Sequence, residues 1–513
     1  MSGLPARRFS LAAVAALAAI AAGCSLQPVY ERPPPAVASE YPTGPAYKAP
    51  PREPSGPTVP AVDVGWRDFM ADPRLQRLVE IALENNRDLR VAVLNVAATR
   101  AQYRIQRATL FPQVSGFADG TRSRTPADLT PSGTAKTLGV WEAGVSAAWE
   151  IDFFGRLQSL TDAQFQQYLA SAQARKAAEI LLVSQVATQY LTVLADDDLL
   201  EVTEHTLETA RASYNLVKLQ FDTGTATELA LRQAETIVEQ AQANYAAQVR
   251  LRAQDENALV LLLGQPLPDD LPPVVRLGEQ PILADIPAGL PSDLLTRRPD
   301  ILQAEALLRS ENANIGAARA AFFPRITLTG SAGTASSSLS GLFKAGSAAW
   351  AFTPSITVPI FEGGALTANL DLAWIQKDIG IAQYQKVIQT AFSEVADGLA
   401  GRGTFDDQVA ALERYTATQQ RRLELSETRF RNGVDPYLTV LTAQTDLYNG
   451  QLILVSARMQ RLTNLVGLYR ALGGGWIQRT GDEPRPADDP GQAGTPVPDT
   501  KWWCWGRLSL RGC

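Results

Sequence analysis

The sequence predicts a mixed α/β membrane protein in which transmembrane β-strands continue into long α-helical coiled coils. Three observations predict this fold: the chain holds two copies of one unit, its long helical segments follow a coiled-coil repeat, and one segment of each copy alternates apolar with polar residues. The chain has 513 residues, of which 45% are hydrophobic and 19% charged. It should therefore fold rather than stay disordered.

The duplication is visible as landmarks that recur in the same order about 210 residues apart. Several matches in one order indicate an internal repeat. The predicted order in each copy is helix, strand, loop, strand, long helix, turn, helix, with residues 61–270 in the first copy and 271–476 in the second. The matched landmarks are Arg87-Asp88-Leu89 with Arg298-Pro299-Asp300-Ile301, Phe111-Pro112 with Phe323-Pro324, Phe153 and Gly155 with Phe361 and Gly363, and the segment from Phe221 to Thr236 with that from Phe430 to Thr445.

The helical segments are long and carry coiled-coil seams. No proline interrupts the chain from Ala365 to Arg431, so a helix of about 66 residues and ~100 Å is expected there. Turns at residues 222–227 and 431–436, which contain Gly224 and Gly433, should reverse the chain and make antiparallel hairpins. The seam positions are Leu207, Ala210, Tyr214, Val217 and Phe221, then Leu231, Ala234, Val238, Ala241 and Tyr245, and finally Leu441, Thr445, Tyr448, Leu452, Val455, Met459, Leu462, Val466 and Tyr469.

Two segments have the period of β-strands. Trp141, Ala143, Val145, Ala147, Trp149 and Ile151 share one face of the first segment, and the second repeats this pattern from Trp350 to Ile360. Apolar residues on one face with polar or small residues on the other are typical of transmembrane strands, although a soluble sandwich also alternates. The partner strands should begin after Pro112 and Pro324, with residues 121–136 and 334–347 as external loops.

Four such strands cannot close a membrane barrel, which needs about eight or more. An open sheet edge in lipid leaves backbone groups without hydrogen bonds, so several chains must pool their strands. The hairpins would pool in the same way into a hollow helical cylinder. The expected object is a conduit rather than a pocket.

The N-terminus has the pattern of an exported lipoprotein. Residues 1–23 combine a basic start with an apolar stretch, as in a signal peptide, and end at Cys24 in Ala21-Ala22-Gly23-Cys24. This resembles a bacterial lipobox, whose cysteine receives a diacylglycerol and an acyl chain, while an ordinary cleaved signal remains the alternative. Ser25 favours sorting to the outer membrane. Residues 24–60 are interpreted as a lipid-anchored extended tether, and residues 477–513 as a flexible tail.

Composition excludes most enzyme classes and a nucleic-acid partner. The net charge is −6, and the chain contains one histidine, His205, and three cysteines. We expect no catalytic residue, no metal and no cofactor beyond the lipid on Cys24. Asp196-Asp197-Asp198 lacks the spacing of a calcium loop and is interpreted as a polar break between helices. No function is assigned to Cys504, Cys513 or the Trp-rich tail. The longest continuous apolar run after residue 24 is Ala258 to Leu263, too short for a membrane helix.

Several segments carry a family resemblance: Val64-Gly65-Trp66-Arg67, the run from Leu83 to Arg90, the run from Gly289 to Leu295 with Arg297-Arg298-Pro299-Asp300-Ile301, and the run from Gly316 to Pro324. From Cys24 to about Trp476 the chain resembles outer-membrane factors of the TolC superfamily, most closely the OprM-type multidrug efflux lipoproteins. The resemblance implies a homotrimer with a 12-stranded barrel and a periplasmic helical barrel. It also implies a periplasmic adaptor and an inner-membrane pump of the resistance-nodulation-division type as partners of a passive exit duct.

A duct needs a closable constriction, which we expect at the helix tips. Leu229 and Leu438, just after the tip turns at Gly224 and Gly433, are candidates for apolar rings, unless they simply pack between helices. Family members usually carry charged residues on the second of these helices, where this chain has Thr439, Thr442 and Thr445. We therefore expect a gate that depends less on salt and pH than an acidic ring.

Two alternatives remain open, while a third, an enzyme that uses only carboxylates, is disfavoured because the sequence contains no pocket-like motif. The first keeps the fold and changes the cargo to secreted proteins or metal ions, because the duct sequence does not identify the cargo, the adaptor or the pump. The second is a lipid-anchored periplasmic coiled-coil scaffold without a pore.

Overall fold

The computed structural model describes residues 25–47, 59–284 and 291–489. They form two compact units. Of the described residues, the sheet unit comprises 25–34, Ala97–Ser171 and Gln303–Gln385. The hairpin unit comprises those within Pro35–Val96, Ala172–Leu302 and 386–489.

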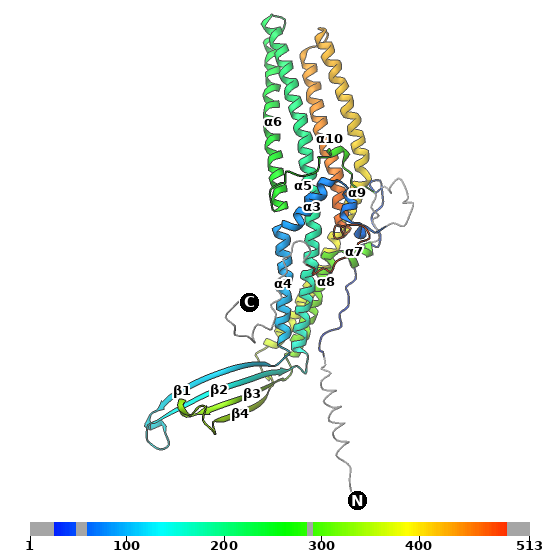
Figure 1. The fold of residues 1–513 in the computed structure, drawn as a ribbon. Coiled ribbons are helices and arrows are strands. Elements are labelled where there is room, and N and C mark those ends of the chain that lie inside the picture. The colour runs from blue at the N-terminus through cyan, green and yellow to red at the C-terminus, as the bar shows by residue number, and fades with distance from the viewer. Residues whose placement is uncertain (1–24, 48–58, 285–290, 490–513) are drawn as a thin grey trace. The chain divides into compact units, whose positions relative to one another are not determined.

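The sheet unit is built on one antiparallel sheet whose four strands follow the order β1-β2-β3-β4 (Figure 1). The two predicted strand pairs are present, and pairing of β2 with β3 joins them. Strands β1 and β2 extend beyond the predicted apolar segments, because Thr121–Thr125 continue the ladder opposite Lys136–Val140, and the predicted loop is correspondingly shorter. Strand β4 ends at Thr357, so the predicted strand pattern up to Ile360 is wrong for its last three residues. The strand bounds are β1 (Gln113–Thr125), β2 (Lys136–Ile151), β3 (Arg325–Ser336) and β4 (Ala348–Thr357).

Two paired glycines permit the close approach of β2 and β3. Gly144 lies opposite Gly333 in the ladder. A Cβ atom on Gly333 would overlap the carbonyl group of Ala143, and one on Gly144 would overlap the carbonyl group of Ala332. Larger residues here would push apart the strands that connect the two halves of the sheet.

Long helices make up most of the described chain. The helix expected over about 66 residues is α9, which has 67, and it begins and ends at the predicted residues. The α-helices are α2 (Trp66–Phe69), α3 (Pro73–Asn85), α4 (Arg87–Ala108), α5 (Arg156–Asp222), α6 (Glu228–Leu263), α7 (Pro291–Arg297), α8 (Pro299–Ala320), α9 (Ala365–Arg431) and α10 (Tyr437–Ala471). Short 3₁₀-helices are η1 (Ala61–Asp63), η2 (Ala127–Leu129), η3 (Leu277–Glu279) and η4 (Leu339–Gly341).

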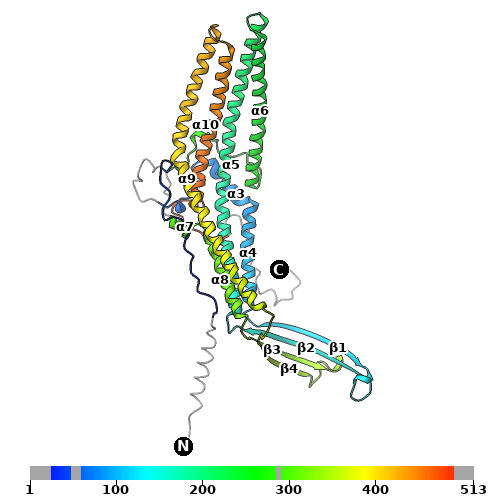
Figure 2. The same cartoon turned by 180° about the vertical axis from the view of Figure 1, so that it is seen from behind.

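In the hairpin unit, α5 lies beside α6 and α9 beside α10, as both views show (Figures 1 and 2). The predicted seam in α5 is buried at Leu207, Ala210 and Val217, with Ala234 and Ala241 of α6 buried against it. Local periodicity therefore identified most of the packed face of this hairpin, but not its end, because the predicted seam residue Phe221 is exposed.

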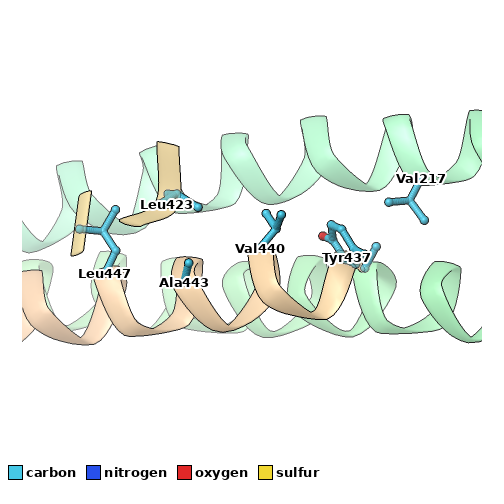
Figure 3. Close-up of a cluster of buried hydrophobic side chains, with 7 residues drawn as sticks. Val217, Leu423, Tyr437, Val440, Ala443 and Leu447 are labelled. Atoms are coloured by element: carbon cyan, nitrogen blue, oxygen red, sulfur yellow. The ribbon is translucent and has the colours of Figure 1, made fainter. Parts of the chain in front are cut away.

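The first half of α10 packs differently from the prediction. Thr445 is exposed and Leu441 is only half-buried, whereas Val440, Ala443 and Leu447 are buried. Figure 3 shows these three side chains in one cluster with residues of α5 and α9. Because α10 faces both its own partner and the other hairpin, its buried face is displaced by about one residue from a two-helix seam. Farther along, the predicted positions Val455, Leu462, Val466 and Tyr469 are buried.

No polar break occurs at the three consecutive aspartates, because α5 continues through them. Asp196 is only 7% exposed, and Gln248 of α6 donates from Nε2 to Asp196 Oδ1 at 3.0 Å. Burial, together with a hydrogen bond to the Asp255 carboxyl, raises the pKa of Asp196 to about 6. A neutral carboxyl can be buried against a second carboxyl, so the helix has no need to end here.

Helix α5 is also more apolar than its longest uninterrupted run suggested. It contains an 18-residue window with a mean hydropathy of 1.3, which meets the composition expected of a membrane span. However, 56% of that window is buried inside the protein. Such burial is typical of a core helix that packs on several sides.

The N-terminal segment of the sheet unit is bound to α8. Asn312 donates from Nδ2 to the Pro28 carbonyl at 2.8 Å, and Arg319 donates from Nη1 to the Leu26 carbonyl at 3.3 Å. A Cβ atom on Gly316 would lie 2.7 Å from the Ser159 hydroxyl and would overlap Gln27. We call residues 25–32 the N-terminal strap. It belongs to the predicted tether, and its position requires glycine on the facing helix.

The described part of the predicted flexible tail is also bound, in the hairpin unit. Trp476 is buried, and the guanidinium groups of Arg175 and Arg485 lie 5.0 and 4.6 Å from the centre of its ring. Glu179 accepts from Arg175 at 3.0 Å and also pairs with Arg485. The tail supplies Arg485 to a buried ion pair, so its charges are not all solvated as composition suggested.

Replacing Gly316 with leucine should release the N-terminal strap, because the larger side chain occupies the space of Gln27. Chymotrypsin should then cut after Tyr30 at least several-fold faster than in the wild type. The matched control is Gly467→Leu, since a Cβ atom at Gly467 meets nothing within 4 Å. Equal cleavage rates in wild type and Gly316→Leu would contradict this packing.

Asp196→Asn should reduce the pH dependence of stability. The Asp196 pKa is raised from 3.8 to about 6, so its neutral form is favoured in the folded state, and its stabilising effect is lost as pH rises through about 6. When the pH is lowered from 7.5 to 5, the free energy of unfolding of wild type should rise by on the order of 1 kcal/mol more than that of Asp196→Asn. Denaturant unfolding at both pH values would measure this. Asp222→Asn, at an exposed site of the same helix, should behave like wild type.

Candidate functional site: the helix tips and the sheet faces

The two hairpins end in turns of the same geometry. Gly224 has φ +78° and Gly433 has φ +70°, which is the left-handed region that glycine adopts without strain. At the first tip, Gly224 N–H donates to the Phe221 carbonyl at 2.9 Å. At the second tip, Gly433 N–H donates to the Phe430 carbonyl at the same distance. The residue after each glycine bonds five residues back, as in a Schellman motif, which closes both helix ends.

The two candidate gate leucines lie at equivalent positions, each at the second residue of its helix. Leu229 is 68% exposed and Leu438 is 53% exposed. Neither side chain is therefore buried between the helices of its own chain. Thr227 caps α6 by accepting from Ala230 N–H at 3.2 Å, which fixes the direction in which that helix leaves the tip.

The three candidate threonines differ in exposure. Thr439 is half-buried, while Thr442 and Thr445 are exposed. The hydroxyl of Thr442 donates to the Leu438 carbonyl at 2.9 Å, and that of Thr445 donates to the Leu441 carbonyl at 3.0 Å. Because the hydroxyl hydrogens of Thr442 and Thr445 are used within α10, these side chains present methyl groups and oxygen lone pairs to their surroundings.

The carboxylates near the tips are each paired with arginine. Asp435 accepts two hydrogen bonds from Arg429, at 2.6 and 2.9 Å, and these bonds lower the pKa of Asp435 below its usual value. Asp446 pairs with Arg422 at 2.6 Å. Glu228 lies 3.5 Å from Arg232. None of these acids is a free charge in the described chain.

Sequence reasoning did not single out Arg429 and Arg422. Arg429 precedes the second turn and Asp435 follows it, so the ion pair closes the base of the turn. The sequence did contain a signal for this ion pair, because an arginine and an aspartate lie on either side of the predicted chain reversal. Arg422 and Asp446 are farther apart along the chain and meet only because α9 and α10 are antiparallel.

One face of the sheet is apolar across all four strands. The register places Val114 beside Ala147, Trp149 beside Leu328, and Ile326 beside Ile356, and paired residues share a face. The large side chains of this face are exposed in the single chain: Val114 68%, Val145 52%, Trp149 37%, Trp350 81%, Phe352 61% and Ile356 67%. Such a continuous exposed apolar surface requires an apolar environment or a partner.

The opposite face carries mainly polar and small side chains, although Phe117, Leu138 and Val140 also lie on it. Ser115 and Ser146 are joined by a hydrogen bond of 2.9 Å between neighbouring strands, and Thr327 and Ser355 by one of 2.7 Å. On the apolar side, Trp141 to Ile151 would rise about 25 Å at a tilt of about 40°, which matches the apolar band of outer-membrane barrels. Beyond this band the same face carries Arg122 and Arg124.

The other candidates lie elsewhere. His205 is exposed on α5, and within the described ranges there is no group of three histidine, cysteine or acidic side chains that could hold a metal ion. Cys24, Cys504 and Cys513 lie outside the described residues.

Comparison with known proteins identifies the family. The model of the outer membrane efflux protein family matches residues 78–265 and 290–474. The toluene efflux pump outer membrane protein TtgC of Pseudomonas putida is 48% identical over 474 residues, which are 92% of this chain and 97% of TtgC. The outer membrane protein OprJ of Pseudomonas aeruginosa is 44% identical over 457 residues, 88% of this chain and 93% of OprJ.

Solved structures of outer membrane channels are similar to this chain as well. The open state of the MtrE outer membrane channel of Neisseria gonorrhoeae has a TM-score of 0.78 at 39% identity and covers 90% of this chain and 100% of its own. The CmeC outer membrane channel of Campylobacter jejuni has a TM-score of 0.80 at 26% identity and covers 91% of this chain and 99% of its own. With its exposed apolar sheet face and its closed helical hairpins, the chain belongs to the outer membrane efflux protein family.

Proposed function

We propose that three copies of this chain form the outer-membrane exit duct of a tripartite efflux system. The observation that carries the proposal is the sheet: its apolar face continues across all four strands, and β1 and β4 are left as unpaired edges within the chain. In lipid, each unpaired backbone group costs several kcal/mol, so these edges must pair with other copies.

The number of copies follows from the interior that a duct needs. Two chains would supply eight strands, and a barrel of about eight strands is filled by its own side chains. Three chains would supply 12 strands and leave a lumen lined by the polar face of the sheet. The long hairpins would then assemble into a helical cylinder on the periplasmic side.

The partners and the cargo follow from the relatives. TtgC is named as part of a toluene efflux pump and ArpC as part of an antibiotic efflux pump. By analogy, this duct would receive apolar organic compounds from an inner-membrane pump of the resistance-nodulation-division type through a periplasmic adaptor. Export of proteins or metal ions has no specific observation in its favour. A scaffold without a pore leaves the exposed apolar face unexplained.

The gate is assigned to the helix tips. Leu229 and Leu438 are exposed in the single chain and lie just after turns of the same geometry, so three copies of each can form apolar rings on a threefold axis. The nearby acids are paired with arginines, which leaves leucine and threonine to line the constriction.

The lipid anchor is assigned to Cys24. The N-terminal strap follows Cys24 directly, and Arg319, in the last turn of α8, holds the Leu26 carbonyl. Helix α8 leads into β3, so the strap is fixed near the start of a membrane strand. An acylated Cys24 would therefore lie close to the membrane surface.

Deletion of the gene should lower resistance to apolar antibiotics several-fold and raise ethidium accumulation, because the exit step is lost. Cys24→Ala tests the anchor separately: it should remove acyl labelling by radioactive palmitate. Unchanged susceptibility and dye accumulation in the deletion strain, when no second duct is expressed, would contradict the proposed function.

The closed trimer should conduct equally in planar bilayers from pH 4 to pH 8, measured in an Asp196→Asn background that removes the titration near pH 6. The hydrogen bonds from Arg429 lower the pKa of Asp435 from its usual value, which favours its ionised form. Thr442→Asp should introduce a step in the conductance above about pH 4, because like charges around a threefold axis raise the pKa of each new carboxyl group. A large step without this substitution would contradict the uncharged gate.

A further inference from the structure

A groove of about 520 Å³ lies between the α5–α6 hairpin and the α9–α10 hairpin of the hairpin unit. All four helices contribute side chains to it, and we call it the inter-hairpin groove. Its apolar wall includes Leu423, Val440 and Leu447, which belong to the cluster in Figure 3. A volume of this size lies within the range of small-molecule sites.

One polar group in the groove is buried without a partner. Gln444 is 8% exposed, and its Nε2 donates to the Ser213 hydroxyl at 3.2 Å. Its Oε1 has no hydrogen-bond partner among the described residues. A buried amide oxygen without a donor is costly, and native proteins leave few of them. The groove therefore offers an acceptor to any molecule that carries a donor.

Four other polar residues that line the groove donate hydrogen bonds within the chain. The bonds are Gln240 Nε2 to Asn244 Oδ1 at 2.9 Å, Gln420 Nε2 to Glu424 Oε1 at 3.4 Å, Thr206 Oγ1 to the Val202 carbonyl at 2.8 Å and Thr445 Oγ1 to the Leu441 carbonyl at 3.0 Å. Each threonine hydroxyl has only one hydrogen to give, so its lone pairs remain. These threonine oxygens therefore add acceptors to the one that Gln444 Oε1 offers.

The acidic side chains of the groove do not make it a cation site. Glu424 pairs with Arg421 at 2.8 Å, and Glu427 pairs with Arg431 at 3.1 Å. With these charges balanced by arginine, the groove presents apolar surface and uncharged acceptors. The matching ligand is therefore uncharged.

We propose that the inter-hairpin groove binds an uncharged amphiphilic organic molecule that carries an N–H or O–H donor. Its aromatic or aliphatic body packs on Leu423, Val440 and Leu447, and its donor bonds to Gln444 Oε1. Because the walls come from both hairpins, the bound molecule bridges them. The site is formed by four helices of one chain, so the proposal does not depend on the pump, the adaptor or the cargo.

Binding is tested with N-phenyl-1-naphthylamine, which has one N–H donor and fluoresces more strongly in apolar surroundings. The full-length protein in lipid nanodiscs is titrated, and the signal of empty nanodiscs is subtracted. We expect saturable binding. The N-methylated probe, which lacks the donor, should bind about fivefold more weakly, as expected for the loss of one hydrogen bond.

Gln444→Leu should abolish this difference, because both probes then lack an acceptor. Gln460→Leu, at an exposed position of the same helix, is the matched control and should preserve it. No saturable binding, equal affinities of wild type for both probes, or an unchanged preference in Gln444→Leu would overturn the proposal. If Gln444→Leu fails to fold, the affinities of wild type for the two probes still test the proposal. A groove that holds only water would show no difference between the probe with the N–H donor and the probe without it.

Discussion

The backbone hydrogen bonds of the sheet edges are the constraint on which the rest of the structure depends. Strands β1 and β4 have partners on one side only, and their apolar faces belong in lipid, where water cannot replace the missing bonds. In the proposed assembly, the edges of β1 and β4 pair with those of other copies, so the sheet supplies the physical reason for that assembly.

The difference between the apolar and the polar face fixes the register of the strands. Side chains alternate between the faces, so a slip of one residue would turn Trp149 and Ile356 toward the polar side. The hydroxyl pair of Thr327 and Ser355 reinforces the observed register on that side. Gly144 and Gly333 act by lacking side chains, because a Cβ atom at either position would push β2 and β3 apart.

Features that depend on local sequence could be predicted, whereas those that depend on a third element could not. Alternation located the strands, the absence of proline located α9, and Gly224 and Gly433 located the tips. The buried face of α10 near Val440 differs from the predicted seam because a second hairpin also packs there. Asp196 stays within a helix because a distant carboxyl, Asp255, supports its neutral form.

The candidate site divides in the same way. Leu229 and Leu438 were predicted as gate candidates because each follows a turn glycine at a fixed distance, which is a local signal. The arginine partners of the tip acids were missed because Arg422 meets Asp446 only after the helices pack. Charge composition could not distinguish a free acidic ring, which would make a gate depend on pH, from acids paired with arginine, which would not.

The contact between the two hairpins is suited to movement. On the polar side it rests on Gln444, whose amide is satisfied at its nitrogen by Ser213 but not at its oxygen. Separating the hairpins would break the hydrogen bonds Gln444–Ser213, Tyr437–Ser213 and Tyr448–Asn244, and it would expose the Gln444 oxygen to water. Water would satisfy the exposed polar groups, so the net free-energy cost of breaking these bonds is small compared with that of opening the apolar cluster around Val440. A gate that opens by displacing one hairpin must overcome mainly that cluster, which lies next to the tips, whereas each hairpin keeps its own seam intact.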